Sequence, residues 1–424
     1  PASRQQTGYY TLGRGTQLTS RTWYVLQNGD WSDPTTWTLD AGTAPIPDND
    51  LNETPGSEDE VVIRNGKTVT IQAATNNLSL SSITVDGSLD ITTSSGHDFG
   101  VINGQGTISI SGSGGLSNFP DGSTTNSNGF GNPANGGLLV VEDALEFDQP
   151  ETFRDVRILA DAATDVVALG ADLTINGDFN VRFGTLQFGD GTTTDRNFTV
   201  IGDFSVENNG GSQDGRVTTA VASNTRHQFN LYGDFLNEGT AQFSDRTVAN
   251  FNAESTNGVV DFKLISTTQD QRGECNGLTY FYRIEIIKNS TDFTAIIQAD
   301  DPGNFVLTGF ANSSIGGDVD DEGDNTNAFG LITGSASIGT NVSVRLNITG
   351  NYSIGTDAKL IVSGGEVTKT GGAAITPYGT IEVTAGTLEV PSGSGITTRD
   401  NGQIIVSGGE LWACQISTSI QGAG

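Results

Sequence analysis

Short runs of alternating apolar and polar residues, each ending at a glycine turn, recur along most of this chain. Three clear copies are Ala358–Val367, Gly379–Leu388 and Gly402–Leu411. Equivalent apolar positions follow one another after 21 residues, from Leu360 to Ile381, and after 23 residues, from Ile381 to Ile404. Alternation with a period of two predicts strands whose side chains point to opposite faces. We therefore expect an all-β chain.

A repeat of about 20 residues made of strands and turns cannot bury its own apolar face. Such repeats gain a core by stacking on copies of themselves, as solenoid proteins do. The same pattern starts near Val61, where Asn65-Gly66 predicts a tight turn with positive φ. The predicted fold class is all-β, a right-handed parallel β-helix (a β-solenoid) with an N-terminal cap.

Changes in the pattern divide the chain into four predicted regions. Residues 1–60 form an N-terminal cap and an acidic loop, and residues 61–249 form regular repeats. Residues 250–327 form irregular or wider repeats with a second acidic loop, and residues 328–424 return to regular repeats. Because solenoid ends need polar caps, we expect the natural protein to continue beyond Gly424. The chain has no methionine, so we interpret its start as that of a processed product or an excerpt.

A Gly-Asp-Phe motif occurs three times, at Gly177-Asp178-Phe179, Gly202-Asp203-Phe204 and Gly233-Asp234-Phe235. Glycine suits a corner, aspartate can hydrogen-bond to the turn backbone, and the aromatic ring can enter the core. We predict that Phe179, Phe204 and Phe235 stack as a structural ladder. The alternative is that these rings are exposed and bind a partner.

Aromatic residues are also concentrated near the start, where Trp23, Trp31 and Trp37 precede the first regular repeat. The first coil of a stack exposes an apolar end and unpaired backbone groups, which large rings and a loop can cover. We predict that the tryptophans form this cap. The alternative is an aromatic platform that stacks against a glycan.

The segment Gly29–Trp37, a proline-containing loop, Val61–Ile63 and Gly66–Ile71 together resemble the opening module of large secreted surface proteins of the Bacteroidetes type. Repeats near Ser407–Leu411 are similar to those proteins' coils. The resemblance covers about 45 residues near the start and about 70 at the end. It implies export by the type 9 secretion system and a right-handed parallel β-helix. The acidic loop is longer than the pattern usually has.

The net charge of −30, from 50 acidic and 20 basic residues, makes some partners improbable. It opposes binding to nucleic acid and docking on anionic lipid, and no segment is long enough for membrane insertion. The charge favours solubility and is compatible with divalent cations. Cys275 and Cys414 are 139 residues apart in a stacked chain, so we predict that they do not form a disulfide.

The best metal candidate is the acidic segment 318–325. Carboxylates alternate there with other residues, and Gly323 occupies the sixth position, as in a calcium loop. The candidate calcium ligands are Asp318, Asp320, Glu322 and Asp324. The twelfth position is Phe329 instead of an acid, so a solvated acidic loop is the alternative. No other cofactor is expected.

The sequence does not contain a recognisable catalytic arrangement. His97 and His227 are each isolated in the sequence, and no Ser-His-Asp, zinc or phosphate-loop pattern stands out. Short matches such as Ser95–Asp98 and Arg283–Glu285 to elements of pectin-degrading β-helices do not occur in the expected order. An enzyme is therefore less expected than a non-enzymatic protein, and no catalytic residue is assigned.

The leading hypothesis is a structural or adhesive stalk of a large secreted protein at the cell surface. Its partners would be glycans or proteins outside the cell. One alternative is a β-helix that binds or degrades polysaccharides, for which carboxylates and a basic residue should converge in a groove. Another is a surface subunit that associates with itself into a filament.

Overall fold

A computed structural model gives the structure of the chain. It describes residues 20–42, 53–72, 75–111, 124–125, 129–210, 214–221, 225–244, 258–308, 328–347, 351–370, 372, 374–391, 393 and 395–418. These residues are organised almost entirely as strands and turns. A single 3₁₀ turn, η1 (Pro34–Thr36), is the only helical element among them. The expected all-β class is therefore confirmed.

The strands belong to five sheets, numbered here in the order in which they begin. Sheet 1 contains β1 (Thr22–Val25), β3 (Trp37–Thr38), β4 (Glu60–Ile63), β6 (Ser82–Val85), β8 (Val101–Asn103) and β10 (Thr124–Thr125).

Sheet 2 extends along nearly the whole described chain. Its strands are β2 (Gly29–Asp30), β5 (Thr68–Ile71), β7 (Ser88–Ile91), β9 (Thr107–Ile110), β11 (Leu138–Val141), β14 (Asp155–Leu159), β17 (Phe179–Phe188), β19 (Phe204–Val206), β22 (Phe235–Asn237), β25 (Gln271–Cys275), β28 (Thr294–Ala299), β30 (Phe329–Ile338), β31 (Ser343–Asn347), β33 (Ala358–Thr370), β35 (Thr380–Val390), β37 (Gln403–Val406) and β38 (Glu410–Ala413).

Three shorter sheets complete the structure. Sheet 3 contains β12 (Leu145–Phe147), β15 (Val166–Leu169), the end of β17, β20 (Gly215–Thr219), β23 (Thr240–Gln242), β26 (Leu278–Phe281) and β29 (Phe305–Leu307). Sheet 4 contains β13 (Glu151–Phe153), β16 (Leu173–Ile175), β18 (Asn197–Val200), β21 (Arg226–Leu231), β24 (Val259–Leu264), β27 (Arg283–Ile287) and the start of β30. Sheet 5 contains β32 (Tyr352–Ile354), β34 (Ile375–Pro377), β36 (Ile396–Thr398) and β39 (Ile416–Thr418).

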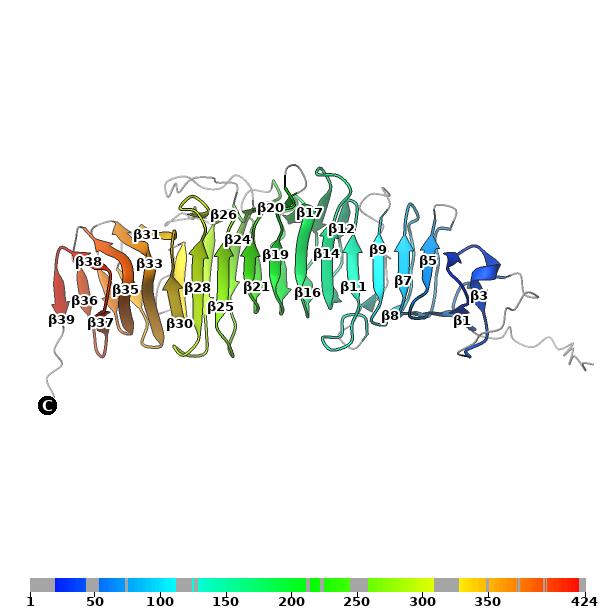
Figure 1. Cartoon of the computed structure of the whole chain (residues 1–424), viewed down its shortest axis with the longest axis horizontal. Coiled ribbons are helices and arrows are strands. Elements are labelled where there is room, and N and C mark those ends of the chain that lie inside the picture. Colours follow the sequence, from blue (N-terminus) through cyan, green and yellow to red (C-terminus); the bar gives the residue numbers. More distant parts are fainter. Residues whose placement is uncertain are drawn as a thin grey trace, which may run out of the picture.

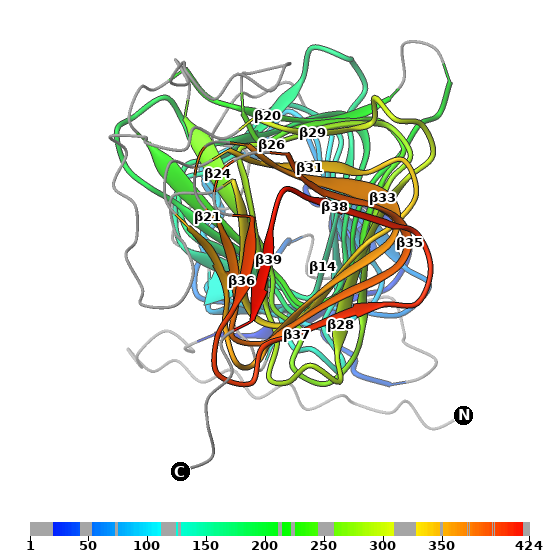
Figure 2. The ribbon, with the colours of Figure 1, turned by 90° about the vertical axis from the view of Figure 1, so that its left-hand side faces the viewer.

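Pairing between the described strands is parallel, with the single exception of β1 and β3. The chain leaves a sheet, contributes to the neighbouring sheets and then returns beside its previous strand, and each such turn is one coil. In Figure 1 the strands lie across the long axis, and the chain advances from β1 at one end to β39 at the other. Figure 2 shows the sheets facing a common interior. This arrangement is consistent with a β-solenoid.

Glycine corners let successive coils approach closely. Gly66, in the predicted turn after β4, has a φ of 75°, which confirms the positive φ expected there. The corner glycines of the Gly-Asp-Phe motif have another role: a Cβ on Gly233 would lie only 2.1 Å from the carbonyl oxygen of Gly202 in the preceding coil. A larger residue at this corner would push the two coils apart.

The interior is a continuous apolar core that follows the stack. Alternating strand positions are buried, as the repeated burial pattern of β5, β7 and β9 illustrates. Aliphatic side chains dominate the core in β4 to β9 and in β33 to β36, whereas phenylalanines from β17 to β29 fill the middle. Strands β24 to β29, within the region expected to be irregular, pair in parallel with the coils before and after them.

Candidate functional site

Three tryptophans gather at the N-terminal end of the stack. Trp23, Trp31 and Trp37 are 1%, 1% and 2% exposed. The Trp31 and Trp37 rings meet edge to face with centroids 4.9 Å apart, and Nε1 of Trp37 donates to the carbonyl oxygen of Trp31 at 2.8 Å. Because all three rings are buried, none presents a face on which a sugar could stack.

The carboxylate of Asp59 ties this end of the chain together. Its Oδ1 accepts a hydrogen bond from the backbone N of Arg21 at 2.8 Å. Its Oδ2 accepts from Nε1 of Trp23 at 2.8 Å and from the backbone N of Gly56 at 2.9 Å. Hydrogen bonds to an ionised acceptor are stronger than neutral ones. Asp59 therefore links β1, the loop before β4 and a buried tryptophan.

The phenylalanines of the Gly-Asp-Phe motif are buried and stacked. The rings of Phe179 and Phe204 have centroids 5.6 Å apart, and those of Phe204 and Phe235 are 6.0 Å apart, with nearly parallel planes in the second pair. Their strands pair in register, so that each phenylalanine lies directly beside the next. Buried rings cannot form an exposed surface for a partner.

The aspartates of the same motif connect neighbouring coils. Oδ1 of Asp178 accepts from the backbone N of Asp203 at 2.8 Å, and Oδ1 of Asp203 accepts from the backbone N of Asp234 at 2.8 Å. The series continues on both sides, through Asp155 to Asp178 and through Asp234 to Arg272. The sequence suggested a bond within the turn. The side chains reach the next coil instead, because the corner glycines bring successive corners together.

A groove of about 450 Å³ crosses the outer face of sheet 2 over β14, β17, β19, β22 and β25. The three motif aspartates form part of its lining, together with other charged side chains and two neutral polar ones. The charged residues are Arg157, Glu207, Arg272 and Glu274, and the neutral polar ones are Asn180 and Ser205.

Hydrogen bonds between its own side chains occupy part of this groove. Nδ2 of Asn180 donates to Oγ of Ser205 and to Oε1 of Glu207, both at 2.8 Å. Polar groups arranged in this way can hydrogen-bond to a polyhydroxylated ligand. The two aromatic residues among the lining, Phe204 and Phe235, are buried in the core. The groove therefore lacks a stacking surface among the residues that line it.

The predicted calcium ligands cannot be placed. Asp318, Asp320, Glu322 and Asp324 all lie within residues 309–327, outside the described part of the chain. The calcium loop stays a prediction.

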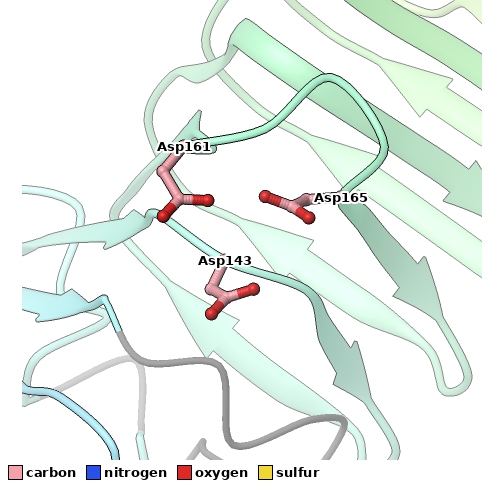
Figure 3. A group of neighbouring side chains, drawn as sticks. All are labelled: Asp143, Asp161 and Asp165. Atoms are coloured by element: carbon pink, nitrogen blue, oxygen red, sulfur yellow. The ribbon is translucent and has the colours of Figure 1, made fainter.

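A different acidic group is formed by Asp143, Asp161 and Asp165 (Figure 3). The carboxylates converge, with one oxygen of each within 4.8 Å of the others. Burial raises the pKa of Asp165, and the neighbouring acids Asp161 and Asp143 raise it further. The donor set is one that hard cations such as Ca²⁺ accept. Sequence reasoning missed this group because its members come from corners of two successive coils.

His97 is buried beside Ser94, but the pair is not arranged for catalysis. Nδ1 of His97 accepts from the backbone N of Leu78 at 3.3 Å, so the proton of the neutral ring is on Nε2. Nε2 lies 3.1 Å from Oγ of Ser94, which in turn donates to the carbonyl oxygen of Ile71 at 3.4 Å. In this tautomer the imidazole donates to the hydroxyl and cannot remove its proton.

His227 is also buried in a corner. Its Nδ1 accepts from the backbone N of Arg196 at 3.1 Å, whereas Nε2 has no hydrogen-bond partner among the described residues. Burial is the main cause that lowers its pKa to about 4. The same cause lowers the pKa of His97 to about 4. Both rings are therefore neutral at physiological pH.

Charged side chains pair on adjacent strands of sheet 4, where Asp261, Arg283 and Glu285 are buried and Arg226 and Lys263 are partly buried. Nε of Arg226 lies 2.7 Å from Oδ2 of Asp261, and Nε of Arg283 lies 2.6 Å from Oε1 of Glu285. Nζ of Lys263 lies 3.4 Å from Oε2 of Glu285. Burial of a charge is tolerated when it is paired in this way. The segment Arg283–Glu285, compared above with an enzyme element, thus supplies an ion pair between its own two charged residues.

The remaining sequence expectations concern cysteines and membrane segments. Cys275 is buried, Cys414 is exposed, and both are free, which confirms that they do not pair. Within the described ranges, no helix is both long and apolar enough to cross a membrane.

Comparison of the chain with protein-family models, with curated proteins and with solved structures finds no match.

Proposed function

We propose that this chain is a structural or adhesive stalk segment of a large secreted protein at the cell surface. In this proposal it folds as a right-handed parallel β-helix whose first coil is capped by the N-terminal region with Trp23, Trp31 and Trp37. The type 9 secretion route suggested by the sequence resemblance belongs to the same proposal.

The observation that carries the proposal is the parallel pairing of coil upon coil, from β4 near one end to β39 at the other. Each coil is held by backbone hydrogen bonds to both neighbours, and the aspartate series adds side-chain bonds along one corner. A stack with this many lateral bonds is stiff along its length, as a stalk requires. The net charge of −30 opposes side-by-side association of such rods.

The N-terminal arrangement supports the assignment of a cap. β3 pairs antiparallel with β1 on the edge away from β4, so that edge is not free to bind another strand. Trp31 and Trp37 pack against the apolar core at the same end. An edge that is covered in this way is protected from adventitious pairing.

Force spectroscopy tests the stalk function directly. The chain, held through tags at its two ends, should resist extension and then unfold in steps of one or a few coils. Solution scattering should give the cross-section of a thin rod. Release of new sugar ends from a panel of soluble polysaccharides would contradict the non-enzymatic part of the proposal.

The groove on sheet 2 favours polysaccharide binding as a second candidate function. Arg157 and Arg272 line it together with carboxylates, which provides donors and acceptors for sugar hydroxyls. In calorimetry against neutral and acidic polysaccharides, the variants Arg157→Ala and Arg272→Ala should weaken any binding in this groove. The control Arg216→Ala changes an exposed arginine of β20 that is not part of the lining. Equal binding by all three variants would place the ligand elsewhere.

A further inference from the structure

Lys288 follows β27 at a corner between sheets 4 and 2, and its side chain is 2% exposed. Among the described residues, no carboxylate lies within salt-bridge distance of its Nζ. Asp270 and Asp234 act on the ammonium only at longer range. The aliphatic part of the side chain lies against Gly334, where a Cβ would be 2.1 Å from Cβ of Lys288. The fold thus leaves room for a lysine to enter the corner.

The group that Nζ of Lys288 contacts is Oε1 of Gln271, a fully buried side chain at the start of β25. This carboxamide is held firmly in place. Its Nε2 donates to the carbonyl oxygens of Leu231 at 3.0 Å and Gly233 at 2.6 Å, in the preceding coil. Its Oε1 also accepts from the backbone N of Ser266 at 2.8 Å. The amide carbon bonded to Oε1 is therefore next to a buried amine.

We propose that Lys288 and Gln271 join to form an intramolecular amide, which cross-links two successive coils. The neutral Nζ attacks Cδ of Gln271, so that a C–N bond forms and the carbonyl becomes a tetrahedral oxyanion. The oxyanion collapses and the bond from Cδ to Nε2 breaks. One proton passes from Nζ to Nε2, which leaves as ammonia, and the other proton stays on Nζ as the N–H of the new amide. Atoms and electrons balance without an oxidant or a second reactant.

Three features of the site favour this reaction. Burial lowers the pKa of Lys288 to about 8, so a useful fraction of the amine is neutral near physiological pH. The backbone N–H of Ser266 points at the oxygen on which negative charge develops, as an oxyanion-hole donor does. Exclusion of water removes the competing nucleophile, and the two side chains are held together by the fold.

The bond would connect the coil of β24, β25 and β26 with the coil of β27, β28 and β29. Backbone hydrogen bonds already pair these coils, for example β25 with β28. The proposal does not depend on the function of the protein, because it concerns only the chemistry at this corner.

Intact-mass spectrometry of the purified chain tests the proposal without any mutation. The expected mass is lower than the sequence mass by one ammonia. Tryptic digestion should then yield residues 264–272 joined to residues 284–345, because trypsin does not cleave after an acylated lysine, and Lys288 is the only basic residue within 284–344. An unmodified mass and normal cleavage after Lys288, persisting after long incubation above pH 8, would overturn the proposal.

Two variants distinguish this cross-link from other reactions that release ammonia. Lys288→Arg should have the full mass calculated from its sequence. Lys359→Arg is the control, because Lys359 pairs with Glu382 far from this corner, and its mass should still be lower by one ammonia. Succinimide formation at Asn65-Gly66 would also release ammonia. It would leave Lys288 cleavable and would persist in Lys288→Arg, and that pattern would count against the cross-link.

Discussion

The two histidines make the stability of this protein sensitive to acid. Burial lowers the pKa of each ring from 6.5 to about 4, so the folded state binds a proton less readily than the unfolded state. Above pH 6.5 both rings are neutral in the folded and the unfolded state, and they do not reduce the free energy of unfolding. As the pH falls from 6.5 towards 4, the unfolded state takes up protons first and the free energy of unfolding decreases.

We predict that His97→Gln loses less stability than the wild type over this pH range. The difference in the free energy of unfolding should be on the order of 2 kcal/mol, because one buried group no longer has to be charged. Urea unfolding followed by tryptophan fluorescence at several pH values measures it. His227→Gln should behave in the same way. If the free energy of unfolding of both variants changes with pH as steeply as that of the wild type, the two imidazoles do not cause the sensitivity to acid.

A second prediction at this scale concerns the aspartate series. Asp203→Ala removes the acceptor for the backbone N–H of Asp234 and should lower stability by about 1 kcal/mol, since the site is exposed. Asp203→Asn keeps an acceptor oxygen and should lose much less. Thermal unfolding of the three proteins distinguishes the bond from a general effect of charge, because both variants remove the same negative charge.

At the scale of strands, the phenylalanines of β17, β19 and β22 act as one packed unit. Phe204 contacts Phe179 and Phe235 along its own column and Phe198 and Phe229 across the core.

Phe204→Ala should therefore lower the free energy of unfolding by about 3–5 kcal/mol, because it leaves a cavity among rigid rings. Phe204→Leu should cost less, since much of the volume is kept. Hydrogen exchange should show the greatest loss of protection in β17, β19 and β22. An equal loss of protection from exchange in every coil would contradict the prediction, because it would show that the stack unfolds as one unit.

Much of the strand structure could be predicted from the alternating pattern. The strands near Leu360, Ile381 and Ile404 lie where the repeat predicts them, and they pair in register. The same pattern could not reveal the acidic group of Asp143, Asp161 and Asp165, because the lengths of the corners decide which side chains meet. The contact between Gln271 and Lys288 was hidden for the same reason.

At the scale of the whole molecule, exposed apolar side chains gather at the C-terminal edge. Trp412 and Ile416 are 61% and 51% exposed, and Val406 and Ile405 are also exposed. Within the described chain, β37 and β38 pair only with β35, and β39 pairs only with β36. Unpaired strand edges beside apolar residues tend to associate.

We predict that this chain of 424 residues self-associates at high concentration and that Trp412→Lys weakens the association. Sedimentation velocity over a range of concentrations measures it. Val221→Lys is the matched control, because Val221 is 79% exposed but lies far from this edge, after β20. A monomer at every concentration, or an equal effect of both substitutions, would contradict the prediction.

The in-register pairing of β30, β33 and β35 has a consequence for how the length of this protein can change. Removal of residues 358–378, which are 21 residues, would place Gly379 directly after Asp357 and set β35 beside β30 with the same faces inward. The shortened chain should fold, with one fewer increment of about 4.8 Å along its axis. Genes for such chains can then gain or lose whole coils while the remaining coils keep their packing. The length of the stack can therefore change without a loss of stability in the coils that remain.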